Sequence, residues 1–108
     1  MNVYFLFAII FDQFQIIHNN AFYSSSLTEI KIPKYVKKIE YGAFHYCNFL
    51  NKVVFDDDSE LVEIQYNAFS STAIEKIKIP RSVQKIGNQL LLNLAINLLL
   101  LHLMTIQN

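Results

Sequence analysis

The chain has 108 residues, and its 53% hydrophobic content with 9 Phe and 6 Tyr can fill a core, which argues against a disordered protein. Its 9 basic and 9 acidic side chains balance, so the sequence lacks the strongly positive surface that binds nucleic acid and any general attraction to anionic membranes. A single cysteine, Cys47, excludes an intrachain disulfide.

The N-terminal segment, residues 1–16, has an apolar stretch at 3–11 that admits two interpretations. A signal peptide contains such a stretch, but here no Lys or Arg precedes it and no small-residue cleavage motif follows soon after. The alternative is a degenerate repeat or cap. The sequence favours this alternative because Phe14 and Ile17 precede Phe22 with the spacing that recurs in the next unit.

An internal repeat occupies residues 17–88. Its marker is an Ala-Phe pair at Ala21-Phe22, Ala43-Phe44 and Ala68-Phe69, so that the phenylalanines are 22 and 25 residues apart. Each pair is followed by an aliphatic residue, an alternating apolar pair, and two apolar residues three apart. In the three units these positions are Leu27, Ile30/Ile32 and Val36/Ile39; Leu50, Val53/Phe55 and Leu61/Ile64; and Ile74, Ile77/Ile79 and Val83/Ile86. Such a period is the signature of a solenoid.

Each alternating pair predicts a strand, since residues two apart on a strand point to the same face. Pro33 and Pro80 follow two of these strands and are expected to end them, because proline cannot donate to a strand ladder. Val36 and Ile39 suit a turn of α or 3₁₀ helix, and the phenylalanines are expected to stack in a column. The predicted fold is therefore an α/β or mainly β solenoid, with a parallel sheet on one wall and short turns or helical pieces on the other.

The stretch Leu27-Thr-Glu-Ile-Lys-Ile-Pro33 and its continuation to Leu50 resemble the BspA-like leucine-rich repeat, and so does Ile74-Glu-Lys-Ile-Lys-Ile-Pro80. The resemblance implies a leucine-rich-repeat solenoid of the kind found in surface proteins of bacteria and parasitic protists. It also implies a protein-binding, adhesion or surface-antigen role at the cell surface or in association with a membrane. Two features depart from the family pattern: the middle unit has the acidic loop 56–60 in place of proline, and the array is short.

The C-terminal segment, residues 89–108, is apolar and carries no Asp, Glu, Lys or Arg. Its stretch 90–106 is 17 residues long, slightly below the roughly 20 that a membrane-spanning helix needs. A cap or a degenerate repeat is the favoured interpretation, because the open end of a solenoid exposes an apolar cross-section. Membrane association through this tail and an end left by truncation are the alternatives.

The sequence does not indicate catalytic or metal-binding chemistry. His45 and Cys47 lie two apart, but the counterparts of Cys47 in the other units are Ser25 and Thr72, so we expect a buried structural thiol. The acidic run 56–58 lacks the spacing and the glycine of a calcium loop. The histidines lack zinc-ligand spacing, and there is no glycine-rich phosphate loop. We therefore expect no enzyme activity, cofactor or metal.

A binding surface is expected on the outward positions of the predicted strands, because solenoids bind through extended surfaces of this kind. These positions are Glu29 and Lys31, Lys52 and Val54, and Lys76 and Lys78. Four of the six are lysine, so this face is expected to be locally basic, and Lys34, Lys37 and Lys38 on the following turn could extend it. The lysines either keep the sheet soluble and discourage edge pairing or attract an acidic partner.

Three hypotheses for function follow. The first is a non-catalytic protein-binding module, with an acidic, host or extracellular protein as partner. The second is a truncated or decayed fragment of a longer repeat protein that has no independent role. The third, an unrecognised enzyme, is the least favoured because no constellation of catalytic residues is present.

Overall fold

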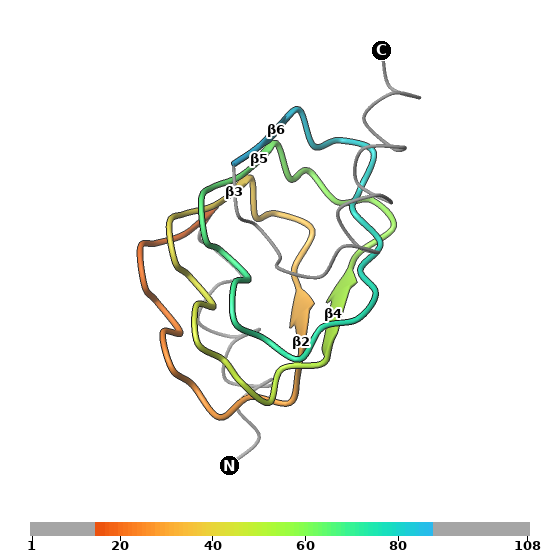
Figure 1. Cartoon of the computed structure of the whole chain (residues 1–108). Coiled ribbons are helices and arrows are strands. Elements are labelled where there is room, and N and C mark those ends of the chain that lie inside the picture. The colour runs from red at the N-terminus through yellow and green to blue at the C-terminus, as the bar shows by residue number, and fades with distance from the viewer. Residues whose placement is uncertain (1–14, 88–108) are drawn as a thin grey trace.

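The structure is a computed structural model and describes residues 15–87. Over this range the chain winds as a coil whose successive turns stack on one another (Figure 1). The strands are β1 (Ile16–Ile17), β2 (Glu29–Ile32), β3 (Lys38–Ile39), β4 (Lys52–Phe55), β5 (Glu63–Ile64) and β6 (Lys85–Ile86). No helix occurs among these residues, and so none of them forms a helix long and apolar enough to cross a membrane.

The strands form two parallel sheets on opposite walls of the coil (Figure 1). One wall carries β1, β3, β5 and β6 in that order, and the other carries β2 and β4. The register of the first wall stacks one isoleucine from each turn of the coil: Ile17 on Ile39, Ile39 on Ile64, and Ile64 on Ile86. The parallel sheet and the repeat architecture predicted from the sequence are confirmed.

The wall of β1, β3, β5 and β6 corrects one prediction. The helical turn expected at Val36 and Ile39 is absent; the tight turn comes earlier, where Val36 N–H donates to the Pro33 carbonyl at 3.2 Å. Ile39 then lies in β3, in extended backbone that pairs with the next turn of the coil. A β-branched residue packs well on such a pleated surface, and its ladder bonds satisfy backbone groups that one short helical turn would leave open.

A second difference concerns the third unit. Ile77 and Ile79 are buried and Lys76 and Lys78 exposed, as the alternation predicts, but these residues form no strand with β4. The loop after β4 is two residues longer than in the neighbouring units, and a cleft lies between this loop and residues 78–82. The two segments are therefore separated where the ladder would continue. The expectation that proline ends a strand holds for Pro33, which directly follows β2.

The core lies between the two walls and contains the predicted column of phenylalanines. Phe44 is fully buried, and its ring stacks on Phe22 and on Phe69 with centroids 5.2 and 5.1 Å apart and planes 3° apart in both pairs. The backbones run in step, since Phe22 N–H donates to the Ala43 carbonyl at 2.7 Å and Phe44 N–H to the Ala68 carbonyl at 2.8 Å. Burial of one such side chain stabilises the fold by about 1.5–3 kcal/mol, so the column is a major part of the core.

The corners of the coil use left-handed backbone at two positions in each unit, two residues before the phenylalanine and two after it. These residues are Asn20, Gly42 and Asn67 (φ 57°, 65° and 60°), and Ser24, Tyr46 and Ser71 (φ 58°, 61° and 60°). Glycine and asparagine tolerate this conformation best. Tyr46 does not, and the conformation costs a bulky residue about 1–2 kcal/mol.

The predictions for the two end segments fall almost entirely outside the described residues. The described range includes only residues 15 and 16 of the N-terminal segment and none of the C-terminal segment 89–108. The degenerate-repeat, cap, signal-peptide and membrane interpretations therefore stay predictions.

Candidate protein-binding face

The face predicted from the sequence lies on the wall formed by β2 and β4 and on residues 76–78 beside them. We call its six residues the lysine face: Glu29, Lys31, Lys52, Val54, Lys76 and Lys78. All six are exposed, while the alternate residues Ile30, Val53 and Ile77 are buried. The period-two pattern therefore places these six side chains where a partner can reach them.

The register of the sheet sets which of these side chains are neighbours. Glu29 of β2 pairs with Lys52 of β4, which places opposite charges side by side. Lys31 pairs with Val54, which places an apolar side chain beside a lysine. Glu29, Ile30, Lys31, Lys52 and Val54 line a shallow concavity of about 260 Å³. Val54 is 39% exposed within this polar surround, which gives the face an apolar contact point inside a charged rim.

The lysine face is positively charged, and nearby carboxylates partly offset this charge. Its four lysines stand against Glu29, and Glu75, which is also exposed, directly precedes Lys76. The face therefore carries more positive than negative side chains, with two carboxylates among its four lysines.

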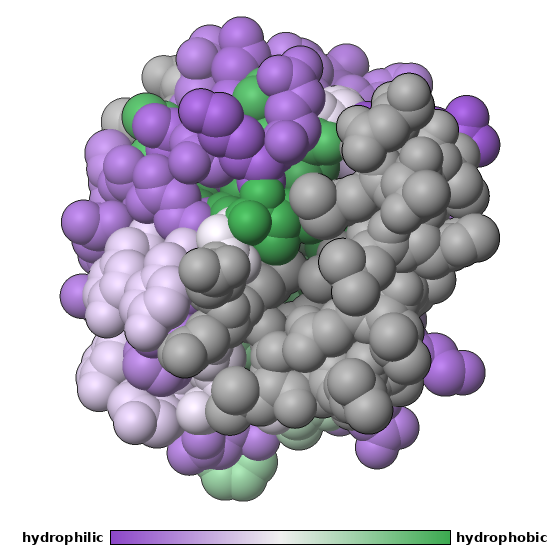
Figure 2. Space-filling view, turned by 45° about the horizontal axis from the view of Figure 1, so that its top comes forward, coloured by the Kyte–Doolittle hydropathy of each residue, from purple (hydrophilic) through white to green (hydrophobic). Residues whose placement is uncertain are grey.

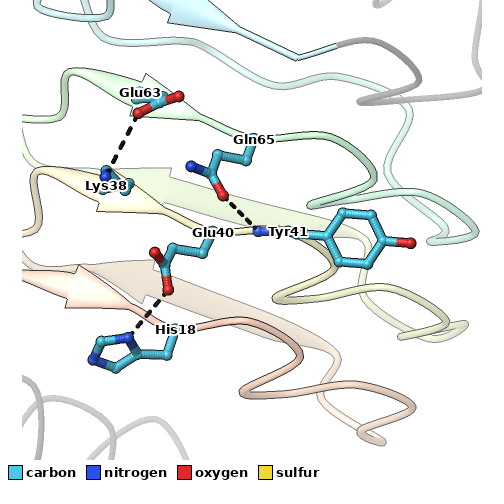
Figure 3. Close-up of polar contacts among 6 residues, drawn as sticks. All are labelled: His18, Lys38, Glu40, Tyr41, Glu63 and Gln65. Atoms are coloured by element: carbon cyan, nitrogen blue, oxygen red, sulfur yellow. Dashed lines mark hydrogen bonds and ion pairs between the residues drawn. The ribbon is translucent and has the colours of Figure 1, made fainter.

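Two of the three lysines on the following turn, Lys37 and Lys38, do not add free charge to this face. Lys38 lies in β3 on the other wall, with its Nζ 3.9 Å from Glu63 Oε1 (Figure 3), and Lys37 Nζ lies 4.0 Å from Glu60 Oε1. Both pairs are partly exposed to solvent, with their charged atoms 3.9–4.0 Å apart, and so contribute little to stability. The prediction that these residues extend the basic surface is thus not supported for Lys37 or Lys38, because each has an acidic neighbour from the next turn of the coil.

The opposite wall carries a ladder of polar contacts between successive turns. His18 Nδ1 lies 3.1 Å from Glu40 Oε1, and Tyr41 N–H donates to Gln65 Oε1 at 3.1 Å (Figure 3). Figure 2, which brings the top of Figure 1 toward the viewer, shows hydrophilic surface there around a smaller apolar patch. The side chains of this ladder join one turn of the coil to the next, so they are occupied in holding the coil together.

Sequence reasoning missed an aromatic surface on the turns between the walls. Tyr23 meets His45 and Tyr46 edge-on, with centroids 5.8 and 5.6 Å apart, and Tyr41 stacks on Tyr66 at 5.4 Å. Tyr23 and Tyr46 are 50% and 45% exposed. The recurrence of Tyr or His directly after the repeat phenylalanine, at Tyr23 and His45, was the available signal. These contacts connect successive turns on the surface, outside the phenylalanine column.

The chemistry of Cys47 is that of a structural residue. Its thiol is fully buried and donates to the Phe22 carbonyl at 3.0 Å, not to His45. Burial raises the pKa of the Cys47 thiol, an effect that a hydrogen bond from the Ser25 backbone partly offsets. The protonated thiol is the weaker nucleophile. Among residues 15–87 no three metal-ligand side chains come together.

Comparison with known proteins gives one family and several structures. The family model described as "BspA type Leucine rich repeat region (6 copies)" matches residues 8–103. The pneumococcal vaccine antigen PcpA has a TM-score of 0.71 and 34% identity over 73% of this chain and 20% of its own. A leucine-rich repeat protein from Bacteroides capillosus has a TM-score of 0.66 and 33% identity, covering 72% of this chain and 57% of its own.

A third structure, the T. pallidum leucine-rich repeat protein TpLRR, has a TM-score of 0.64 and 31% identity, with 69% of this chain and 35% of its own covered. No curated protein sequence matches the chain. The chain thus corresponds to between a fifth and somewhat more than half of each of these three proteins.

Proposed function

The chain belongs to the BspA-type leucine-rich repeat family, and from that premise we propose that it is a non-catalytic protein-binding module whose partner docks on the lysine face. The observation that carries this proposal is the exposure of all six face residues over three successive units. An extended surface of repeated outward positions is what a solenoid offers a partner.

An acidic protein is the partner that this face fits best. Lysines on one face raise the rate of encounter with an acidic surface, and this electrostatic attraction weakens as the salt concentration rises. Val54, exposed beside Lys31 and Lys52, supplies apolar area for contact after encounter. Exposed lysines also keep a sheet soluble. A binding experiment therefore separates attraction of an acidic partner from this solubilising role.

A location at the cell surface is part of the proposal. The support is the family itself and the fact that one similar structure, PcpA, is a vaccine antigen. In such a location the partner would be an extracellular or host protein.

The experiment measures binding of a labelled glutamate-rich peptide to the full chain by fluorescence anisotropy at increasing salt. We expect binding that weakens with salt, and a loss of about tenfold or more in affinity for the double variant Lys52→Glu/Lys76→Glu, since 1.4 kcal/mol corresponds to a factor of ten. Lys85→Glu is the matched control, because Lys85 is exposed on the opposite wall. Equal losses in the double variant and in the control would show that the lysine face is not the docking surface.

A second candidate role is suggested by the length of the similar structures. PcpA is covered over 20% of its length and TpLRR over 35%, which is the relation expected if the chain works as one part of a longer array. Unfolding of the isolated chain tests this: a single cooperative transition supports an independent module, whereas a broad, non-cooperative one supports dependence on further repeats.

A further inference from the structure

A cleft of about 260 Å³ lies at the corner where the acidic loop of the middle unit meets the third unit. Its lining residues are Phe55, Asp56, Asp57, Ser59, Lys78, Ile79, Pro80, Arg81 and Ser82. Residues 55–59 form one side and residues 78–82 the other, so the cleft joins two units that are successive turns of the coil.

The cleft exists because the middle unit is longer. Leu61 comes six positions after Phe55, whereas Val83 comes four positions after Ile79. The extra length is ordered by local bonds: Asp58 N–H donates to Asp56 Oδ1 at 2.9 Å, and Ser59 N–H donates to the Asp56 carbonyl at 3.0 Å. A loop held in this way presents a defined wall.

The two sides of the cleft carry opposite charges. Asp56 and Asp57 lie on the loop, and Lys78 and Arg81 lie on the third unit. Between them, Phe55 and Ile79 supply apolar area. A ligand that bears only one charge meets attraction from one side and repulsion from the other, whereas a ligand with both charges is attracted by both sides.

A buried hydroxyl marks the same cleft. Ser82 Oγ is inaccessible to solvent and has no hydrogen-bond partner among the residues that the structure describes. An unsatisfied buried hydroxyl destabilises the fold, and Ser82 lines the cleft from the side that carries the two cations. This atom is closed to water in the structure, so a carboxylate that these cations attract can accept from it once the Ser82 side chain rotates toward the cleft.

We propose that this cleft binds a free α-amino acid, with its ammonium group toward Asp56 and Asp57 and its carboxylate toward Lys78, Arg81 and Ser82. The volume of about 260 Å³ lies just below the 300–1,000 Å³ typical of sites for drug-sized ligands, which suits an amino acid. The ligand's side chain lies over Phe55 and Ile79. The cleft shares Lys78 with the lysine face, but its other lining residues lie outside that face, and this proposal does not depend on docking there.

The test titrates the full chain with leucine, N-acetyl-leucine and leucinamide, followed by calorimetry. N-acetylation removes the ammonium charge and amidation removes the carboxylate, so we expect each derivative to bind at least about tenfold more weakly than leucine, as the loss of one charge-assisted bond implies. Absence of leucine binding at millimolar concentrations, or equal binding of leucine and either derivative, would overturn the proposal.

Ser82→Ala separates a binding role for the hydroxyl from a structural one. Removal of an unsatisfied hydroxyl leaves the fold at least as stable, while the affinity for leucine falls several-fold. Lys78→Gln is expected to lower the affinity for leucine about tenfold. Lys85→Gln is the control and leaves that affinity unchanged, because Lys85 is exposed on the opposite wall, away from the cleft and from the lysine face. Leucine binding that is unaffected by both Ser82→Ala and Lys78→Gln would place the ligand elsewhere and refute the assignment.

Discussion

The phenylalanine column provides the most direct test of how the coil is held together. Phe44 is fully buried between two parallel rings at 5.2 and 5.1 Å. Truncation of a buried phenylalanine to alanine costs about 3–5 kcal/mol, against a total stability of about 5–15 kcal/mol for a typical domain. We therefore expect Phe44→Ala to lose a large part of the free energy of unfolding and to be partly unfolded at room temperature.

Phe44→Leu isolates the contribution of stacking from that of burial. Leucine keeps most of the apolar volume but loses both ring contacts, each of which contributes about 0.5–1.5 kcal/mol beyond area burial. The expected loss is therefore about 1–3 kcal/mol. Urea denaturation followed by circular dichroism measures it, and tyrosine fluorescence gives an independent signal because the chain contains no tryptophan.

Phe49→Ala is the matched control. Phe49 has the same side chain but is 64% exposed, so its truncation is expected to change stability by less than about 0.5 kcal/mol. If Phe44→Leu were as stable as the original chain, the ring contacts would contribute nothing. If Phe49→Ala were as damaging as Phe44→Ala, the column would not be the centre of the core.

Two further predictions concern the corners of the coil and the buried thiol. Gly42→Ala is expected to lower the free energy of unfolding by about 1–2 kcal/mol, because Gly42 has φ 65° and an added Cβ would collide with Asn20 Oδ1. Part of the lost stability should return when Asn20→Gly removes the colliding side chain. A Gly42→Ala chain as stable as the original would contradict this reasoning. The raised pKa of Cys47 predicts slow reaction of the folded chain with a disulfide reagent at pH 7–8 and rapid reaction in urea, and rapid modification of the folded chain would refute it. The folded state favours the neutral thiol, so Cys47 contributes to the free energy of unfolding below the ordinary thiol pKa of about 8.5. This contribution is lost as pH rises through the pKa of the folded state. Cys47→Ala should abolish this pH dependence.

The sequence predicted the elements that depend on side-chain periodicity. Ile30 and Ile32 alternate with exposed residues, and Phe22, Phe44 and Phe69 stack as their spacing implied. Periodicity predicts these features because it fixes which side of the chain a residue faces. The exposure of the lysine face follows from the same rule, while its role in binding stays a proposal.

What the sequence did not predict depends on the backbone. A spacing of three, as between Val36 and Ile39, fits either one helical turn or a tight turn followed by a strand, and the choice is made by ladder bonds to the next coil. The left-handed backbone at Tyr46 has no signature in the residue type, which disfavours it. Ion pairs such as that of Lys38 with Glu63 can be predicted only when the register between β3 and β5 is known.

The irregular middle unit connects the two proposals. In a regular solenoid each turn repeats the contacts of the last. Here the longer loop stays bonded to the preceding turn, since Glu60 N–H donates to the Lys34 carbonyl at 3.0 Å, and the cleft opens toward the following turn. Here the separation coincides with the end of the β2–β4 ladder and with the charged cleft beside Phe55 and Ile79. Shortening the loop by deletion of Asp57 and Asp58 would restore the four-residue step of the other units. It should extend the ladder to residues 76–79, raise stability and abolish amino-acid binding, while leaving the exposed lysines of β2 and β4 and their affinity for acidic peptides intact. Hydrogen exchange of the residue 76–79 amides would measure the first effect. Unchanged exchange would show that the insertion is not what separates the third unit from β4.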